Sequence, residues 1–262
     1  MDNKGVLAMK RIKRRKRKFH VVLFILLILL AFGVALLGTD VFNIKKISVL
    51  GNEKLRYNQI IKLSGITQGE NIFKIKLGEV VKSIEQNPYI VVDNIYRRLP
   101  DEIVIEITER QISYLIPYLG SYIGIDSQGV VLEVVDDTSM IDKPIINRLT
   151  ISNFSLGEEI AIADPQQGQA LKEVMGSIEE SGMFEYISEV NLERPDNIII
   201  FSREGIEVIM GDTRNFENKL KWMKIALEDL RQKGNIRGIL DVSIDGQAIF
   251  KPLEGKGEGN EG

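Results

Sequence analysis

The chain has 262 residues, of which 44% are hydrophobic and 27% charged. These values are typical of a folded protein and exclude a low-complexity or collagen-like chain. It contains no cysteine, which excludes disulfide bonds, thiol nucleophiles and thiolate metal sites. The net charge of −3 is unevenly placed, because residues 1–39 hold nine Lys and Arg against one acid, a net of +8, and residues 40–262 carry −11. The two parts are therefore expected to meet different surroundings.

An apolar run follows the basic N-terminal segment. Residues 21–37 contain no charged or polar side chain, and with their neighbours they reach the roughly 20 residues that span a bilayer. We predict a cytoplasmic segment at 1–20 and a transmembrane helix at 21–39, since Lys and Arg flank the cytoplasmic end of such helices. A cleavable signal peptide is the alternative, although its apolar core is shorter, about 7–15 residues. The basic run fits a topology signal better than a nucleic-acid site, so no nucleic-acid partner is expected.

Residues 42–110 are predicted to form one compact domain with the element order β-α-α-β-β. The expected strands are 44–50, 91–97 and 102–109, and the expected helices are 56–64 and 76–87. Apolar residues recur at helical spacing in the second helix. The last strand is predicted to be half-buried, because Ile103, Ile105 and Ile107 alternate with a solvent-facing set, Glu102, Val104, Glu106 and Thr108. A three-stranded sheet with two helices on one face would hide the apolar side of every element.

Residues 111–252 are predicted to form a second domain, a mixed α/β domain with a mostly antiparallel sheet. The expected strands are 113–118, 122–125, 130–135, 187–192, 198–201, 206–210, 239–243 and 247–251. Two long helices, 165–181 and 215–232, carry apolar stripes, and Asp164 is the expected N-cap of the first. The fold class is therefore α+β. Residues 253–262 are predicted to be a disordered tail, because EGKGEGNEG cannot build a core.

No catalytic constellation emerges from the sequence. The only histidine is His20, at the edge of the apolar run, so a Ser-His-Asp hydrolase lacks its base. The Ser-x-x-Lys motif of penicillin-binding enzymes and a phosphate-binding loop are both missing, as are His and Cys clusters for a metal. Adjacent acids such as Asp136-Asp137 read as solvated charge, although a lone catalytic Glu keeps a membrane-anchored peptidoglycan-cleaving enzyme open as an alternative. We predict no enzyme, no cofactor and no metal site.

Three stretches of the sequence nevertheless form a recognisable series. The first is 42–51, FNIKKISVLG, and the second is 96–110, YRRLPDEIVIEITER. The third is 206–251. Their characteristic residues are Arg98, Pro100, Ile105, Glu109 and Arg110 in the second stretch, and Gly211, Asn218-Lys219-Leu220 and Leu240-Asp241 in the third. In this order, behind one N-terminal apolar run, the chain resembles the FtsQ/DivIB family of bacterial cell-division proteins, in its Gram-positive DivIB form.

The resemblance implies a POTRA-like domain at 42–110 followed by the β-rich domain of that family. It also implies a non-enzymatic scaffold of the divisome that binds FtsL-like and DivIC/FtsB-like bitopic proteins, and through them FtsW and a class B penicillin-binding protein. The expected location is the cell membrane at the division septum, with the N-terminus cytoplasmic and the C-terminus extracellular. A second POTRA-bearing class, the outer-membrane translocation components, needs a β-barrel for which about 150 residues with two long helices leave no room.

The last predicted strand, 247–251, is the expected partner-binding site. A chain-terminal strand often lies at a sheet edge, where unpaired main-chain groups can accept a further strand. The resemblance points to the same strand, since family members are thought to bind the FtsB/DivIC partner there. One departure is Val242-Ser243-Ile244, where the family often has Arg and an aromatic residue. The predicted partner-binding residues are Ile244, Gly246, Gln247, Ala248, Ile249 and Phe250.

Overall fold

A computed structural model describes residues 20–28, 33, 39–137, 141–234 and 237–253. Within these ranges no helix combines the length and apolar character needed to cross a membrane. The predicted transmembrane helix at 21–39 falls partly outside the described residues, as do nearly all of the basic segment at 1–20 and of the tail at 253–262. The chain divides into two compact units, Met1–Ile84 with Val92–Glu109, and Glu85–Val91 with Arg110–Gly262. Each unit is described separately below.

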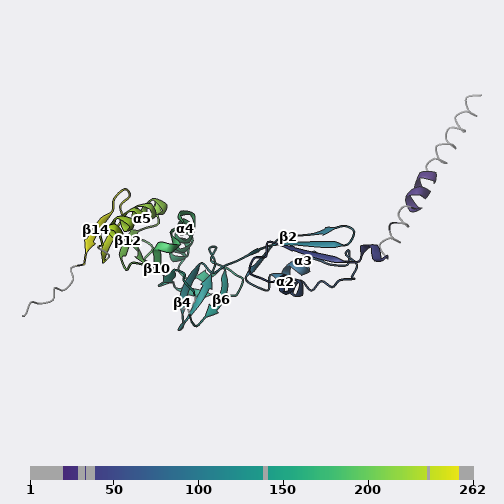
Figure 1. Ribbon diagram of the computed structural model, residues 1–262, viewed down its shortest axis with the longest axis horizontal. Helices are drawn as coiled ribbons and strands as arrows, with labels where there is room; N and C mark the ends of the chain where they lie inside the picture. The colour runs from purple at the N-terminus through teal and green to yellow at the C-terminus, as the bar shows by residue number, and fades with distance from the viewer. Residues whose placement is uncertain (1–19, 29–32, 34–38, 138–140, 235–236, 254–262) are drawn as a thin grey trace, which may run out of the picture. The chain divides into compact units, whose positions relative to one another are not determined.

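The first unit has the predicted element order. A short 3-10 turn, η1 (Asp40–Phe42), precedes β1 (Lys46–Leu50), α2 (Tyr57–Ser64), α3 (Leu77–Ile84), β2 (Ile90–Arg98) and β3 (Glu102–Glu109). The sheet order is β1-β3-β2, with β1 parallel to β3. Both helices pack on the sheet from one side (Figure 1). Ile60 of α2 and Ile84 of α3 are fully buried, so the apolar stripe of each helix supplies the core.

The middle strand of this sheet differs from its prediction in one respect. The alternation in β3 predicted that Val104 faces solvent, but its side chain is completely buried, like that of Ile105. The reason is that β3 lies between two neighbours, whose side chains cover its second face as well. Glu102 on that face is also buried, and it accepts hydrogen bonds from Ser48 at 2.6 Å and Arg98 at 3.0 Å.

The second unit contains a nine-stranded sheet in the order β14-β13-β12-β11-β10-β7-β4-β5-β6. Five of its eight neighbouring pairs are antiparallel and three are parallel, so the α+β class with a mostly antiparallel sheet is confirmed. The strands are β4 (Tyr114–Tyr118), β5 (Ser121–Ile125), β6 (Val131–Val135), β7 (Ile145–Asn147), β10 (Ile187–Asn191), β11 (Ile198–Ser202), β12 (Glu207–Gly211), β13 (Gly238–Asp241) and β14 (Ile249–Pro252). A separate two-stranded sheet joins β8 (Ile151–Asn153) to β9 (Ala161–Ile162).

Two long helices cover the nine-stranded sheet (Figure 1). They are α4 (Pro165–Ser181) and α5 (Phe216–Lys233), and the 3-10 turn η2 (Met183–Tyr186) follows α4. The predicted N-cap is confirmed, because the Asp164 side chain accepts the Gln166 N–H at 2.9 Å. The predicted stripes are buried too: Leu171, Val174, Met175 and Ile178 on α4, and Phe216, Leu220, Met223, Leu227 and Leu230 on α5. They meet strand residues such as Val208 and Leu240 in one core.

Candidate functional site

The strand β14 forms one edge of the nine-stranded sheet. It pairs with β13 in antiparallel register, with Leu240 opposite Phe250 and Asp241 opposite Ile249. The predicted strand, 247–251, began two residues too early, because Gln247 N–H closes a turn onto the Ile244 carbonyl at 3.2 Å. The prediction of an edge strand is confirmed, and its outer side pairs with no other strand in the described part of the chain.

The main-chain groups of β14 alternate between β13 and the open side. Leu253 N–H donates to the Arg237 carbonyl at 3.2 Å, and hydrogen-bonded pairs in an antiparallel ladder recur at every second residue. Odd-numbered residues of β14 therefore direct their N–H and carbonyl toward β13. The even-numbered residues, Phe250 and Pro252, direct theirs outward. Since proline has no N–H, Phe250 supplies the one outward donor within β14.

The side chains of β14 divide between the core and the surface. Phe250 is half-buried and packs on the core of the second unit, on the same sheet face as its partner Leu240. Its ring also covers Gly238, where an added Cβ would lie 2.4 Å from a ring carbon. Ile249 points to the other face and is 49% exposed. Ile249, not Phe250, is therefore the apolar side chain that β14 presents to solvent.

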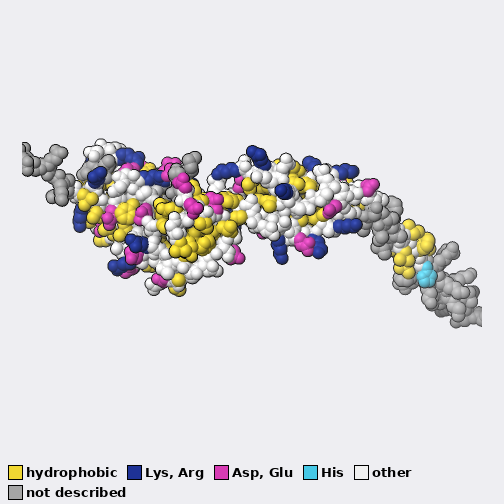
Figure 2. Space-filling model, turned by 90° about the horizontal axis from the view of Figure 1, so that it is seen from below, with side chains coloured by type: hydrophobic (Ala, Val, Ile, Leu, Met, Phe, Trp, Pro, Cys, Tyr) yellow, Lys and Arg dark blue, Asp and Glu magenta, His cyan; other side chains and the backbone are white. Residues whose placement is uncertain are grey.

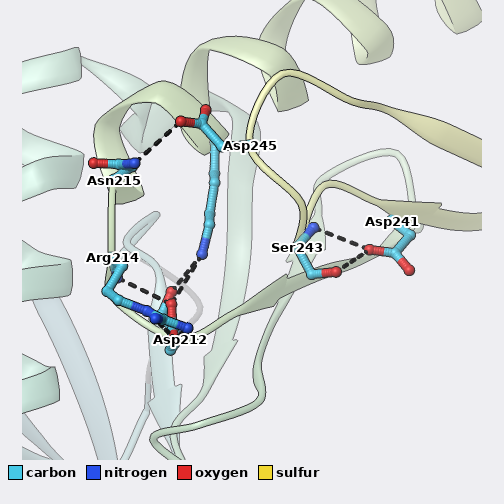
Figure 3. Close-up of polar contacts among 7 residues, drawn as sticks. Asp212, Arg214, Asn215, Asp241, Ser243 and Asp245 are labelled. Atoms are coloured by element: carbon cyan, nitrogen blue, oxygen red, sulfur yellow. Dashed lines mark hydrogen bonds and ion pairs between the residues drawn. The ribbon is translucent and has the colours of Figure 1, made fainter.

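A group of polar residues holds the turn that leads into β14 (Figure 3). The Asp212 carboxylate, just after β12, accepts a hydrogen bond from Arg214 at 2.6 Å and one from Lys219 at 3.2 Å. The Lys219 ammonium also donates to the Asp212 carbonyl at 2.8 Å, and the Lys219 side chain is almost entirely buried. The hydrogen bond from Arg214, assisted by that from Lys219, lowers the pKa of Asp212 to about 2 although burial opposes the shift.

The same group reaches the turn itself. Asn215 adopts a left-handed conformation, φ 52°, at the start of α5, and its side-chain amide donates to Asp245 at 3.0 Å. Figure 3 shows this contact crossing from the start of α5 to the turn. Nearby, the Asp241 carboxylate accepts the N–H of Ser243 at 2.9 Å and its hydroxyl at 2.7 Å. The end of β12, the start of α5 and the end of β13 thus fix where the turn begins.

Five of the six predicted partner-binding residues are exposed, and Phe250 is the exception. Ile244 is 60% exposed, and Gly246, Gln247 and Ala248 are exposed as well. Gly246 has a φ of 79°, a left-handed conformation that favours glycine in the turn. Leu253, just after β14, is a further exposed apolar residue that the sequence prediction missed. Only the structure reveals this exposed residue, because Leu253 lies beyond the predicted strand.

Comparisons with known proteins decide the family. A family model described as "POTRA domain, FtsQ-type" matches residues 42–110. The protein named cell division protein DivIB from Clostridium tetani is 30% identical over 232 residues, which are 88% of this chain and 85% of the relative. This chain belongs to the DivIB/FtsQ family of cell-division proteins. Cell division protein FtsQ from Syntrophotalea carbinolica is 27% identical and covers 86% of this chain and 80% of its own length.

A solved structure of the major extracytoplasmic domain of DivIB from Geobacillus stearothermophilus also matches. The match covers 48% of this chain and 97% of that chain, at 18% identity and a TM-score of 0.32.

The residues that carry the DivIB/FtsQ resemblance make local contacts in this structure. Arg98 pairs with Glu102 at 3.0 Å, and Arg110 pairs with the buried Asp126. The Glu109 carboxylate accepts three main-chain N–H groups, from Glu53, Lys54 and Leu55, at 2.8, 2.9 and 2.9 Å. Burial raises the pKa of Glu109, but these three donors outweigh it, so the pKa lies below its ordinary value. These residues hold each unit together from within.

The acidic side chains do not gather into a metal site among the described residues, where no group of three or more His, Cys, Asp or Glu lies close enough to hold an ion. Acids from two adjacent pairs in the sequence, Asp136-Asp137 and Glu158-Glu159, are engaged separately. Asp136 accepts a hydrogen bond from Ser121 at 2.6 Å, and Glu159 pairs with Lys172 at 2.5 Å.

Proposed function

We propose that this chain is a non-enzymatic scaffold of the bacterial divisome that captures a small bitopic division protein on the outer edge of β14. The observation that carries the proposal is the open edge of this strand, which directs Phe250 N–H and two carbonyls away from the sheet. A partner segment that adds as a further strand gains main-chain hydrogen bonds there, and side-chain contacts give selectivity. Ile249, Ile244 and Leu253 supply exposed apolar surface beside the edge.

The partners in this proposal are FtsL-like and DivIC/FtsB-like proteins, and through them FtsW and a class B penicillin-binding protein. Its domains are a cytoplasmic segment at 1–20, an anchor at 21–39, a POTRA-like domain at 42–110, a β-rich domain at 111–252 and a tail at 253–262. The anchor places the two folded domains outside the membrane at the septum. Relatives named cell division protein support the setting, and the apolar run at 21–37 supports the anchor.

Substitutions at outward-facing positions test the edge. Ala248 immediately precedes β14 and has the same parity as Phe250, so we expect its N–H to face the partner. Ala248→Pro removes that donor and should weaken binding of a DivIC-like protein by about tenfold, the free energy of one hydrogen bond. Ala248→Ser retains the N–H and is the matched control. Pro252→Ala adds an outward donor and should strengthen binding several-fold.

The measurement is affinity for a purified DivIC-like protein by titration calorimetry, with circular dichroism to show that each variant is folded. Folded Ala248→Pro that binds as tightly as Ala248→Ser would show that β14 is not the capture edge. Zymography of the purified chain on peptidoglycan tests the non-enzymatic role, and a cleared band would contradict it.

A further inference from the structure

One end of the first unit is joined directly to the apolar N-terminal run. This proximal end consists of residues 40–46, 70–76 and 97–102. η1 begins at Asp40, three residues after Leu37, the last residue of that run. Three residues span at most about 11 Å. If residues 21–39 anchor the chain, as proposed above, Asp40, where the proximal end begins, must lie within that distance of the membrane surface.

The three segments of the proximal end are bound to one another by main-chain hydrogen bonds. Ile72 N–H donates to the Phe42 carbonyl and Ile44 N–H to the Glu70 carbonyl, each at 2.8 Å. Lys45 N–H donates to the Asp101 carbonyl at 2.9 Å. Figure 1 shows η1 and the turn between β2 and β3 at the same end of this unit. The proximal end is therefore one continuous surface.

At its centre a tight turn presents Phe73 and Lys74 to solvent. The Asn71 side-chain oxygen accepts a hydrogen bond from Phe73 N–H at 3.0 Å. The main-chain carbonyl of Asn71 accepts one from Lys74 N–H at 2.9 Å. The Arg97 guanidinium donates to the carbonyls on either side, to Ile72 at 2.9 Å and Ile75 at 2.6 Å. Four hydrogen bonds thus hold a two-residue tip in place.

The tip is apolar and carries an uncompensated cation. Phe73 is 45% exposed although its ring contacts Phe42 edge-on, with centroids 5.3 Å apart. Val41 and Leu99 are further exposed apolar residues of the same end. Lys74 is exposed and takes part in none of the ion pairs found among the described residues.

The other charges of the proximal end are close to balanced, and Figure 2 shows both basic and acidic side chains at this end of the first unit. Four cations are paired with acids: Lys45 with Asp101, Lys46 with Glu102, Arg98 with Glu102, and Lys76 with Glu79. Arg97 donates to two main-chain carbonyls and forms no ion pair within the described part of the chain. The acids Asp40 and Glu70 belong to the same end. Apolar contact at Phe73, rather than net charge, must therefore supply most of the attraction to a membrane.

We propose that the proximal end rests on the phospholipid surface, with Phe73 inserted among the headgroups and residue 74 lying at the same depth. Aromatic and aliphatic side chains next to lysine bind the interface between headgroups and acyl chains. The occupant is the bilayer that holds the anchor, because covalent attachment keeps it within reach of every copy of the chain. Docking of this kind fixes the orientation of the first unit at the membrane, which a single anchoring helix does not.

The absence of cysteine in the chain permits a direct test. The full chain with Lys74→Cys carries an environment-sensitive fluorophore at the tip and is reconstituted into phosphatidylcholine–phosphatidylglycerol nanodiscs. Leu50→Cys is the matched control, since Leu50 is 49% exposed and ends β1, about 13 Å along the strand from Lys46. A lipid with a nitroxide on its headgroup should quench about half of the emission from position 74 and about a tenth or less from position 50.

Phe73→Ser in the Lys74→Cys background separates insertion from mere proximity. We expect it to reduce quenching at position 74 at least about twofold, because the side chain that enters the headgroup layer is gone. Equal quenching at positions 74 and 50, or quenching unchanged by Phe73→Ser, would overturn the inference. Co-elution of the labelled chain with the nanodisc is scored separately, so that failure of the anchor, which would remove the basis of the inference, is distinguished from failure of docking.

Discussion

The two edges of the nine-stranded sheet are treated differently by the chain. At β6 the chain covers the start of its own edge: Val131 N–H donates to the Glu158 carbonyl at 2.9 Å, and Gly157 N–H donates to the Val131 carbonyl at 2.8 Å. Tyr89, whose pKa is raised by burial and by its hydrogen bond with Glu133, lies beside the same strand. At β14 no described segment plays this part.

The uncovered outer edge of β14 is therefore the edge of this sheet that is open to a partner strand. An open strand edge is an aggregation hazard that proteins normally cover or shorten. Here one edge is covered by residues 157–160, and the other is only four residues long and ends in proline. An edge that is short but uncovered admits a short partner strand while limiting indiscriminate pairing.

The covering of the β6 edge should be essential for stability. Ile160 is buried in the core of the second unit, and its N–H donates to the Gly129 carbonyl at 2.9 Å. Ile160→Asp places an unpaired charge in that core and should cost about 3 kcal/mol or more in the free energy of unfolding. Urea denaturation measures the loss. Ile249→Asp, at the exposed position of the open edge, should cost under about 0.5 kcal/mol, and an equal loss at both sites would contradict the comparison.

The attachment of β14 to the sheet should depend on Gly238, because glycine has no side chain at this position. A Cβ there would lie 2.5 Å or less from two carbons of the Phe250 ring and 2.6 Å from the Lys251 carbonyl oxygen. Since the last of these is backbone, relief requires β14 itself to move. Gly238→Ala should therefore destabilise the second unit by about 1–3 kcal/mol and speed hydrogen exchange of the Ile249, Lys251 and Leu253 amides, which face β13.

The control for this substitution is Gly176→Ala in α4, where an added Cβ meets nothing within 4 Å. Alanine has the higher helix propensity, so this variant should be neutral or stabilised by up to about 1 kcal/mol. Equal exchange rates at β14 in the two variants would show that Gly238 does not control how the strand is seated.

These features differ in how far the sequence reveals them. The helix start at Asp164 and the apolar stripes of α4 and α5 are local or periodic signals, and all were predicted correctly. β7 was not predicted, because three residues between two parallel neighbours show no period and depend on the sheet around them. The burial of Val104 was missed for a related reason, since cover on the second face comes from other strands.

The sequence predicts where the candidate site lies but not which of its groups face outward. A terminal apolar segment after Asp245-Gly246 indicates a last strand, and terminal strands are often edges. Which residues face outward depends on the register with β13, and the hydrogen bond between Asn215 and Asp245 joins residues 30 apart in sequence. No local pattern encodes either. That Phe250 packs on the core while Ile249 is exposed can be stated only once the register is known.

A matched pair of exposed apolar residues tests the two edges for binding. Ile249 on β14 is 49% exposed and Val134 on β6 is 46% exposed. Ile249→Asp should weaken binding of a DivIC-like protein by about tenfold, because a partner strand would desolvate the new carboxylate. Val134→Asp should leave binding unchanged. Titration calorimetry distinguishes the two, and an effect at Val134 that equals the one at Ile249 would mean that β14 is not the preferred edge.

The charge of Asp212, which helps to hold the turn before β14, should make a small pH-dependent contribution to the free energy of unfolding. The folded-state pKa of Asp212 is about 2, below the ordinary value of about 3.9. The carboxylate therefore stabilises the fold fully above about pH 4, and that contribution is lost as the pH falls through the folded-state value of about 2. Because Asp212 is partly exposed, the contribution should be about 1 kcal/mol or less.

Asp212→Asn removes it at every pH, so the difference in unfolding free energy between wild type and variant should shrink from pH 5 to about pH 2. Glu102 in the first unit, whose pKa is also lowered to about 2 by hydrogen bonds from Lys46 and Ser48, titrates in the same range in both proteins. The readout is therefore hydrogen exchange at the Ile249, Lys251 and Leu253 amides, which Glu102 does not contact. A wild-type to variant difference at β14 that stays constant down to pH 2 would show that the Asp212 charge does not support the edge.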